Sequence, residues 1–474
     1  MESQLTDYIL QQSYCCITPV ESCEAVERHS VYETFPTTKL WIGKDYTNFI
    51  VKDFNNLHQP FQDLVDRNVT PRMPWHDVGA MVEGSAARDL ARHFIQRWNA
   101  TKMEKAKINS QYPYLVPKAY KVYNKDFQIP DINKVQVSCQ VVRSVSHWSA
   151  GFLDVDTWEG SIHEAYVDAI SKARHYIYIE NQFFISFPSP HVKNQVSDAI
   201  YKRIMRAHKE GSVFRVYIVL PLLPGFEGEV GTPSGTALHS ITHWNYASIS
   251  RGKDSLLGRL KESGIQNPSE YITFHGLRKH SVLNCEPITE LIYVHSKLLI
   301  ADDRLVICGS ANINDRSLIG KRDSEIAVVI EDEEFKKGVM NGEPYLRGKF
   351  SGCLREYLFK EHLGLLGTVK NCYDVADPVS AKFYHDVWRA TAAKNTEIFE
   401  QVFHCIPSDQ ASNFQAMKRY MQEPMSRTDP AAAKARLIDI RGHLVTFPLH
   451  FLCDETLTPT AGRVEGMMPT SLWT

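Results

Sequence analysis

The sequence predicts an α/β fold in which a mixed sheet lies between layers of helices. Through the middle of the chain, short runs rich in valine, isoleucine and tyrosine alternate with longer segments of helical periodicity. A strand pair with an unusual cluster of polar residues lies near the end of this region. The segments from about Val369 onward favour helices. We therefore expect one complete α/β lobe, part of another lobe before it, and a mostly helical carboxy-terminal extension.

The amino-terminal third is predicted to hold less regular structure. Residues 1–35 are polar and weakly patterned, which indicates a disordered leader. Leu40–Lys52 has strand composition, and a loop is expected over Pro71–Asp77. Val78–Trp98 has helical periodicity, although Gly84 and Ser85 could break or cap that helix. Residues 36–145 are expected to be the remainder of a first lobe.

Residues 146–368 are predicted to form the complete lobe, and residues 369–474 the extension that packs on it. The predicted helices of the lobe are Ser161–Arg174, Val192–His208 and Ala237–Ile249. Its predicted strands are Tyr176–Phe184, Phe214–Leu220, Tyr271–Phe274, Leu291–Ala301, Leu305–Cys308 and Glu325–Ile330.

The composition indicates a protein of the cytoplasm that neither crosses a membrane nor is secreted. The formal net charge is −2, which argues against bulk attraction to nucleic acid. No apolar run approaches the ~20 residues needed to span a bilayer, and no signal-peptide pattern is present. The ten cysteines lack disulfide-rich or zinc-site spacing. Cys15 and Cys16 could accept a palmitoyl group, or could be two thiols of a disordered leader.

The most specific pattern lies at Glu290–Ser317. It places His295, Lys297, Asp302, Gly309, Ser310 and Asn312 at fixed spacing. Side chains of a strand alternate between its faces, so His295 and Lys297 should share a face with Tyr293 and Leu299. The returning strand should then bring Ser310 and Asn312 near them.

This set of side chains suits a phosphodiester. An ammonium group, an amide and a hydroxyl can hold phosphate oxygens, while a histidine can attack phosphorus or transfer a proton near neutral pH. The histidine needs a partner for its second ring nitrogen, and Glu325 is the candidate. Asp302 is expected to hold loop backbone rather than substrate. This chemistry requires no metal.

Two features of the sequence compete with this interpretation. His295 and Lys297 could be ordinary surface residues of a hairpin, but the agreement at the other motif positions favours function. A second match, from His191 and Lys193 to Asp198, lacks the later glycine, serine and asparagine. Its helical periodicity would also keep His191 and Lys193 from lying side by side.

With these residues, the chain resembles the eukaryotic phospholipase D family, in particular the animal type. Further blocks carry the resemblance: Thr70–Asp77, Ala86–Asn99, Tyr176–Ile185, Leu220–Gly228 and the terminal Trp473-Thr474. The family builds its active site from two such motifs, and the first precedes the block at Thr70–Asp77. No histidine-x-lysine motif occurs upstream of that block here. The chain therefore looks like a carboxy-terminal portion of such an enzyme.

The resemblance implies hydrolysis of phosphatidylcholine to phosphatidic acid and choline, with transfer to primary alcohols as a side reaction. It assigns the general acid/base to His295 and the attack on phosphorus to the histidine of the other motif. Lys297, Ser310 and Asn312 would hold phosphate oxygens, and Glu325 would orient an imidazole. Trp473-Thr474 would lie near the site. Phe226, Glu227 and Trp244 are weak candidates for choline recognition, and each could equally be structural.

The resemblance also implies membrane partners. Arg88 and Arg92 lie one helical turn apart, and in the animal family the matching helix contributes to binding phosphatidylinositol 4,5-bisphosphate, an expected activator. The alternative is a solvated helix face. Small GTPases of the Arf and Rho type are further possible partners, and no cofactor is expected.

Two other functions remain open from the residues alone. The chain could be a catalytically incomplete fragment that binds lipid or GTPases and regulates such an enzyme. It could also be another phosphodiesterase of the superfamily, such as a nuclease or a cardiolipin synthase. The Tyr176–Ile185 and Leu220–Gly228 blocks and the near-neutral charge disfavour this last function.

Overall fold

The computed structural model describes residues 13–16, 58–59, 61–62, 66, 70–117, 134–226, 228–367 and 373–458. Leu40–Lys52, Glu227 and Trp473-Thr474, on which predictions were made, lie outside them. Within the described ranges, no helix combines the length and the apolar character that a membrane span requires.

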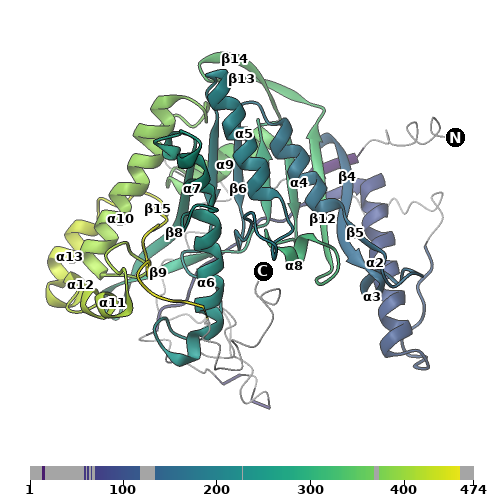
Figure 1. Ribbon diagram of the computed structural model, residues 1–474, viewed down its shortest axis with the longest axis horizontal. Coiled ribbons are helices and arrows are strands. Elements are labelled where there is room, and N and C mark those ends of the chain that lie inside the picture. Colours follow the sequence, from purple (N-terminus) through teal and green to yellow (C-terminus); the bar gives the residue numbers. More distant parts are fainter. Residues whose placement is uncertain are drawn as a thin grey trace.

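A large mixed sheet organises these residues (Figure 1). Its strands run in the order β2-β9-β8-β7-β6-β10-β11-β12-β4-β1-β3, with β15 paired to β8 and β5 to β4. Strands β6, β7 and β8 are parallel to one another, as β2 is to β9, and the other pairs are antiparallel. The strands are β1 (Ser13–Cys16), β2 (Trp75–His76), β3 (Met81–Gly84), β4 (Lys134–Ser146), β5 (Trp158–Gly160), β6 (Tyr176–Glu180), β7 (Arg215–Val219), β8 (Ile272–Leu283), β9 (Glu286–Val294), β10 (Leu298–Ala301), β11 (Leu305–Gly309), β12 (Glu325–Asp332) and β15 (Leu444–Thr446).

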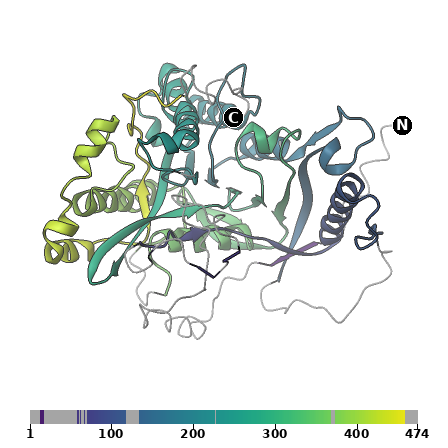
Figure 2. The ribbon, with the colours of Figure 1, turned by 90° about the horizontal axis from the view of Figure 1, so that it is seen from below.

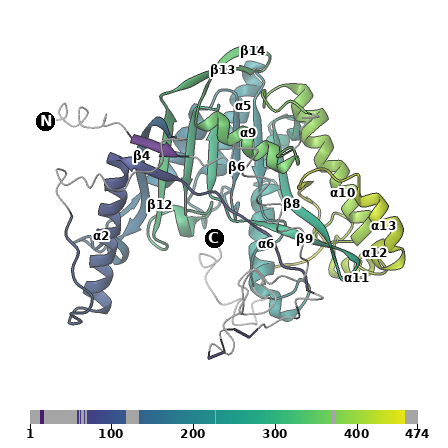
Figure 3. The ribbon, with the colours of Figure 1, turned by 180° about the vertical axis from the view of Figure 1, so that it is seen from behind.

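Helices cover both faces of the sheet. On one face lie α4 (Ser161–Lys172), α5 (Val196–Glu210), α6 (Thr236–Ile249) and α7 (Leu256–Glu262), and the opposite face is covered by α9 (Ser351–His362) and α10 (Ala390–Phe403) (Figures 1 and 3). Strand β6 serves both layers because its side chains alternate: Ile177 and Ile179 join the core under α4 and α5, whereas Tyr176 and Tyr178 join the core under α9. The α/β fold predicted from the sequence is confirmed.

The carboxy-terminal residues form the expected, mostly helical extension at one end of the sheet (Figure 2). A π-helix over Lys382–Arg389 runs into α10, and α11 (Phe414–Tyr420), α12 (Met425–Thr428) and α13 (Pro430–Leu437) follow. Strand β15 then adds to β8, through the register Leu444 to Leu277. The hairpin of β13 (Phe335–Met340) and β14 (Glu343–Gly348) was not predicted, and neither was β15.

Two predictions for the amino-terminal part need correction. Within the expected disordered leader, Ser13–Cys16 forms β1, which pairs with β3 and β4. The helix expected from Val78 begins at Ser85 as α2 (Ser85–Lys105), because the residues before it form β3 and Gly84 has a φ of 88°. Strand β4 pairs with β12 along eight residues, so one sheet continues from β4 into the strands of the second predicted lobe.

The motif segment differs from the single strand expected at Leu291–Ala301. Strand β9 ends at Val294 and β10 begins at Leu298, so His295 and Lys297 lie in the link between them. The predicted alternation nevertheless persists across the link. Tyr293 and Leu299 belong to the core under α4, and the residues that alternate with them belong to the core under α9, namely Ile292, Val294, Leu298 and Ile300.

The turn between β10 and β11 binds the segment that follows α4 on one side of the sheet and α9 on the other. Asp302 and Asp303 each have a φ of 53°, as a tight hairpin turn of the mirror-image type requires. The Asp302 carboxylate accepts hydrogen bonds from three backbone N–H groups, those of Arg174, His175 and Tyr176. Asp303 instead forms a two-pronged ion pair with Arg355 of α9, at 3.0 and 2.6 Å, and both side chains are buried.

We predict that Arg355→Met lowers the free energy of unfolding by about 3–5 kcal/mol, because it leaves the Asp303 carboxylate buried without its partner. Urea denaturation would measure this change. The double variant Asp303→Asn/Arg355→Met should recover part of the loss. Lys172→Met, which breaks an exposed pair with Asp168, is the matched control and should change stability by less than about 1 kcal/mol. If Arg355→Met and Lys172→Met lowered the free energy of unfolding equally, this account would be contradicted.

Candidate active site

The site is organised by the pairing of two strands that are far apart in the sequence. Strand β2 runs parallel to β9, with Trp75 opposite Tyr293 and His76 opposite Val294. The backbone N–H of His295 donates to the carbonyl of His76 at 2.7 Å. Because side chains alternate, Trp75 and Asp77 lie on the His295 side of the strand, and His76 lies on the other. The pairing of β2 with β9 thus places the Asp77 carboxylate next to His295.

Asp77 is the partner of His295. The Nδ1 atom of His295 lies 2.8 Å from the Asp77 carboxylate, and the Trp75 ring packs on the imidazole at 4.6 Å between centroids. Burial would raise the pKa of Asp77, but the hydrogen bond and charge of His295, together with the charge of Lys297 and a hydrogen bond from Trp75, outweigh burial and lower that pKa. A carboxylate acceptor keeps a proton on Nδ1, which leaves Nε2 to exchange protons with a ligand. The His295 side chain is 34% exposed.

Lys297 is a buried amine beside this pair. Its ammonium group donates to Oε1 of Gln182 at 3.0 Å and to the carbonyl of His295. Burial lowers the pKa of Lys297 to about 8, and the nearby carboxylates of Asp77 and Glu325 offset burial only in part. Gln182 also donates to the hydroxyl of Tyr293 at 2.8 Å. Lys297 is therefore held in place by protein groups and is poised to gain from an anionic ligand.

The expected contact between Glu325 and His295 is not formed, and this prediction is corrected. Glu325 accepts hydrogen bonds from the hydroxyls of Ser310 and Ser317, at 2.5 and 2.8 Å. Strand β12, which carries Glu325, passes close to Gly309, where an added Cβ would lie 2.3 Å from the Ala327 Cβ. The glycine of the motif is thus needed for close strand packing, and Glu325 reaches the motif serine rather than the histidine.

The remaining motif residues, Asp302 and Asn312, differ in role: Asp302 binds backbone, whereas one end of the Asn312 amide has no partner among the described residues. The Asp302 carboxylate accepts hydrogen bonds from three backbone N–H groups, in keeping with the role expected for it. The Oδ1 atom of Asn312 is buried and has no hydrogen-bond partner among the described residues. Buried amide oxygens are seldom left unpaired, so this end of Asn312 is available to a hydrogen-bond donor, whereas only its amide N–H groups could donate to a phosphate oxygen.

A second polar cluster lies under the sheet, on the α9 side. Glu180 contacts Nε2 of His76 at 2.8 Å and Nε2 of His362 at 3.0 Å, and all three residues are buried. Tyr178 also donates to Glu180. Burial disfavours the charged imidazole of His76, but the Glu180 carboxylate outweighs burial and raises the pKa of His76 to about 9. These residue types can hold metals, but here their reactive atoms are hydrogen-bonded to one another.

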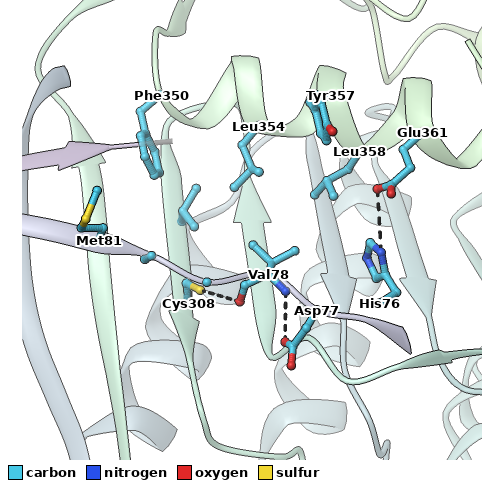
Figure 4. Close-up of a pocket in the computed structure, with 13 residues that line it drawn as sticks. His76, Asp77, Val78, Met81, Cys308, Phe350, Leu354, Tyr357, Leu358 and Glu361 are labelled. Atoms are coloured by element: carbon cyan, nitrogen blue, oxygen red, sulfur yellow. Dashed lines mark hydrogen bonds and ion pairs between the residues drawn. The ribbon is translucent and has the colours of Figure 1, made fainter. Parts of the chain in front are cut away.

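A groove of about 490 Å³ leads to this cluster, and Figure 4 shows the residues that line it. Val78 and Met81 line one side, and Phe350, Leu354 and Leu358 of the α9 region line the other. At its end, Nδ1 of His76 lies 3.8 Å from the Glu361 carboxylate, whose side chain is one-third exposed. Solvent can therefore reach the edge of the otherwise buried cluster.

The other predicted site residues belong to other elements of the fold. Arg88 and Arg92 are on α2, and Arg92 forms an exposed ion pair with Asp89 at 2.9 Å. Phe226 and Trp244 join an aromatic cluster with Phe183, which follows Gln182 in the sequence. In the rejected second match, Asp198 lies on α5 and pairs with Lys202 and Arg259. The helix expected from Val192 begins at Val196, so Lys193 precedes it rather than lying on it.

Sequence reasoning missed Asp77, Gln182 and Glu180 as parts of the site. All three belong to the Thr70–Asp77 and Tyr176–Ile185 blocks, which were recognised only as points of resemblance. The signal that could have found Asp77 is a lone acid that ends a predicted loop with two prolines, Pro71 and Pro74, and one tryptophan, Trp75. Its role depends on the long-range pairing of β2 with β9, which periodicity does not reveal.

The fold and site define a phosphodiesterase-like centre, and comparison with known proteins gives its family. The sequence profile of the Phospholipase D family matches residues 42–409. This chain therefore belongs to the phospholipase D family. It is 48% identical over 448 residues to Phospholipase D1 of Homo sapiens, and the match covers 94% of this chain and 41% of that protein.

Other relatives give the same result. Identity to Phospholipase D2 of Bos taurus is 48% over 439 residues, with 92% of this chain and 46% of that protein covered. Phospholipase D zeta 2 of Arabidopsis thaliana is 37% identical, with 90% and 50% covered. The chain thus spans half or less of the length of these relatives. Among solved structures, the match to NucT from Helicobacter pylori spans 41% of this chain and 86% of NucT. The two are 17% identical, and the TM-score is 0.23.

We predict that Lys297→Met stabilises the fold at pH 7 by on the order of 1–3 kcal/mol, because it removes a buried charge. The pKa of Lys297 is about 8 in the folded chain and about 10.4 in an unfolded one. Between these values the unfolded chain binds more protons, so wild-type stability rises with pH.

The advantage of Lys297→Met should therefore shrink as the pH approaches about 10. Urea denaturation of the wild-type and Lys297→Met proteins at pH 7 and at about pH 10 would measure this difference in the free energy of unfolding. Lys202→Met, on the exposed surface of α5, is the control and should show no such pH dependence. A Lys297→Met protein that is no more stable than wild type at pH 7 would contradict the burial argument.

Proposed function

We propose that this chain carries one half of a phospholipase D active site, which hydrolyses phosphatidylcholine to phosphatidic acid and choline and transfers the phosphatidyl group to primary alcohols. The observation that carries the proposal is the hydrogen bond between His295 and Asp77 beside the buried Lys297 ammonium. An oriented imidazole next to a fixed positive charge is the arrangement that proton transfer at a phosphodiester requires.

In the proposed mechanism, the histidine of the other motif attacks phosphorus and forms a phosphohistidine. His295 donates its Nε2 proton to the departing choline oxygen, and the Asp77 carboxylate stabilises the imidazolium beforehand. His295 then takes a proton from water, which attacks phosphorus and releases phosphatidic acid. Lys297 and the amide N–H of Asn312 hold phosphate oxygens, which places positive and hydrogen-bonding groups where negative charge accumulates. Ser310 donates its hydroxyl to Glu325, so it would have to turn away from that carboxylate to reach a phosphate oxygen.

Choline recognition and membrane binding belong to the same proposal. Phe183, Phe226 and Trp244 form an aromatic cluster next to Gln182, and aromatic faces attract quaternary ammonium groups. Arg88 and Arg92 on α2 would bind phosphatidylinositol 4,5-bisphosphate as an activator, since basic residues contribute about 1 kcal/mol each at an anionic leaflet. The chain would then act as a peripheral protein on the cytoplasmic face of membranes, with Arf- or Rho-type GTPases as further partners.

A regulatory function is the second candidate. It is favoured by the single motif: the chain offers His295 as acid/base, but the attacking histidine must come from another segment or another copy. Losing the nucleophile of a covalent mechanism costs many orders of magnitude in rate. A fragment of this kind would keep the lipid- and GTPase-binding surfaces without releasing choline.

Choline release from vesicles of phosphatidylcholine and phosphatidylinositol 4,5-bisphosphate separates the two candidates. We expect His295→Ala to lower the release rate by roughly 10²–10⁴-fold, the usual contribution of a general acid/base. Vesicle binding, measured by co-sedimentation, should stay unchanged. His191→Gln alters an exposed histidine of the second motif match and serves as the matched control. Equal and negligible release by wild type and His295→Ala, with binding retained, would favour the regulatory function.

Asp77→Asn provides a second test of the same site. The amide keeps the size of the carboxylate but cannot stabilise the imidazolium, so release should fall although the chain still binds vesicles. A variant as active as wild type would show that the Asp77 contact has no part in turnover.

A further inference from the structure

The cluster beneath the sheet is joined to the site above it by a single peptide unit. His76 and Asp77 are consecutive, and the alternation of β2 sends their side chains to opposite faces. Asp77 reaches His295 on one face, and His76 reaches Glu180 on the other, each at 2.8 Å. A movement of His76 must therefore move Asp77 as well.

Strand β2 is held on both of its faces. It is two residues long and, among the described residues, pairs with β9, and the backbone N–H groups of Tyr293 and His295 donate to the carbonyls of Pro74 and His76. On one face Trp75, which is 42% exposed, packs on the rings of Tyr293 and His295. On the other face the contact of His76 with Glu180 is buried, and it anchors the segment toward α9.

The charges around His76 favour this anchor. Glu180 and Tyr178 face it from β6, Glu361 and His362 from α9, and His443 from the chain before β15, while Asp77 follows it in sequence. Carboxylates outnumber cations in this set, and Glu180 is completely buried. A buried carboxylate is costly without a cation, so Glu180 holds the His76 imidazolium, and with it the segment, in one place.

We propose that His76 is a positioning residue: its ion pair with Glu180, under the sheet, holds the Asp77 carboxylate against Nδ1 of His295. The importance of this for turnover rests on the function proposed above, but the positioning itself does not. His76 never touches the reacting atoms, and it acts through Asp77.

The test observes the hydrogen bond directly rather than activity. In the full chain labelled with ¹⁵N-histidine, the Nδ1 proton of His295 should give a slowly exchanging imidazole resonance, assigned by its loss in His295→Gln. Asp77→Asn should abolish it. His76→Gln should speed its exchange with solvent by roughly tenfold or more, as expected for losing a hydrogen bond to a charged group. His191→Gln should leave it unchanged.

A rescue variant separates positioning from general damage. In His76→Gln/Glu180→Gln, two amides can bond to each other and no carboxylate remains buried alone, so the His295 resonance should return toward the wild-type exchange rate. The other histidine resonances report whether each variant is folded. An unchanged His295 resonance in a folded His76→Gln chain would overturn the proposal.

A titration of the wild-type chain needs no variant to fold. Glu180 keeps His76 protonated to about pH 9, so the ion pair is present at neutral pH and is lost as the pH rises through that value. The hydrogen-bonded resonance of His295 should weaken together with the deprotonation of His76, which its own ring signals report. If His76 deprotonates and the His295 resonance persists, the proposal is wrong. Absent choline release with this coupling intact would instead refute only the proposed function.

Discussion

The parallel pairing of β2 with β9 is the constraint on which the candidate site depends. It joins a two-residue strand to the strand that leads into the motif, more than two hundred residues later. Without it, His295 would have no acidic partner, because the other nearby carboxylate, Glu325, is occupied by Ser310 and Ser317. One short stretch of backbone hydrogen bonds thus determines which ring nitrogen of the histidine faces the protein and which faces a ligand.

The site also holds opposing charges that burial makes expensive. The depressed pKa of Lys297 and the raised pKa of Glu325 have the same main cause, the loss of water around the charged form. Each charge lowers the cost of the other, and Asp77 adds to the balance on the lysine side. Strongly perturbed pKa values of this kind are common at active sites, where a ligand of the proposed type, a phosphate group, would replace the missing water.

Local patterns revealed much of this fold in advance, and long-range pairing accounts for what they left out. Tyr176–Glu180, Arg215–Val219 and α4 follow directly from apolar periodicity. The spacing of the motif placed His295 and Lys297 on one face, which the two cores bear out through Tyr293 and Leu299. Choosing Asp77 over Glu325 as the partner of His295 required knowing that β2 pairs with β9, which depends on tertiary contacts rather than on local sequence.

The turn at Asp302-Asp303 has a consequence for how variation in this family is interpreted. Asp302 binds the backbone at the start of β6, and Asp303 binds Arg355 of α9. The two aspartates therefore stabilise the packing of the layers and take no direct part in the reaction. A sequence change there would reduce how much folded protein a cell accumulates, while each surviving molecule would keep its chemistry. Loss of activity caused by a substitution at Asp302 would therefore reflect a smaller amount of folded protein rather than a damaged reaction centre.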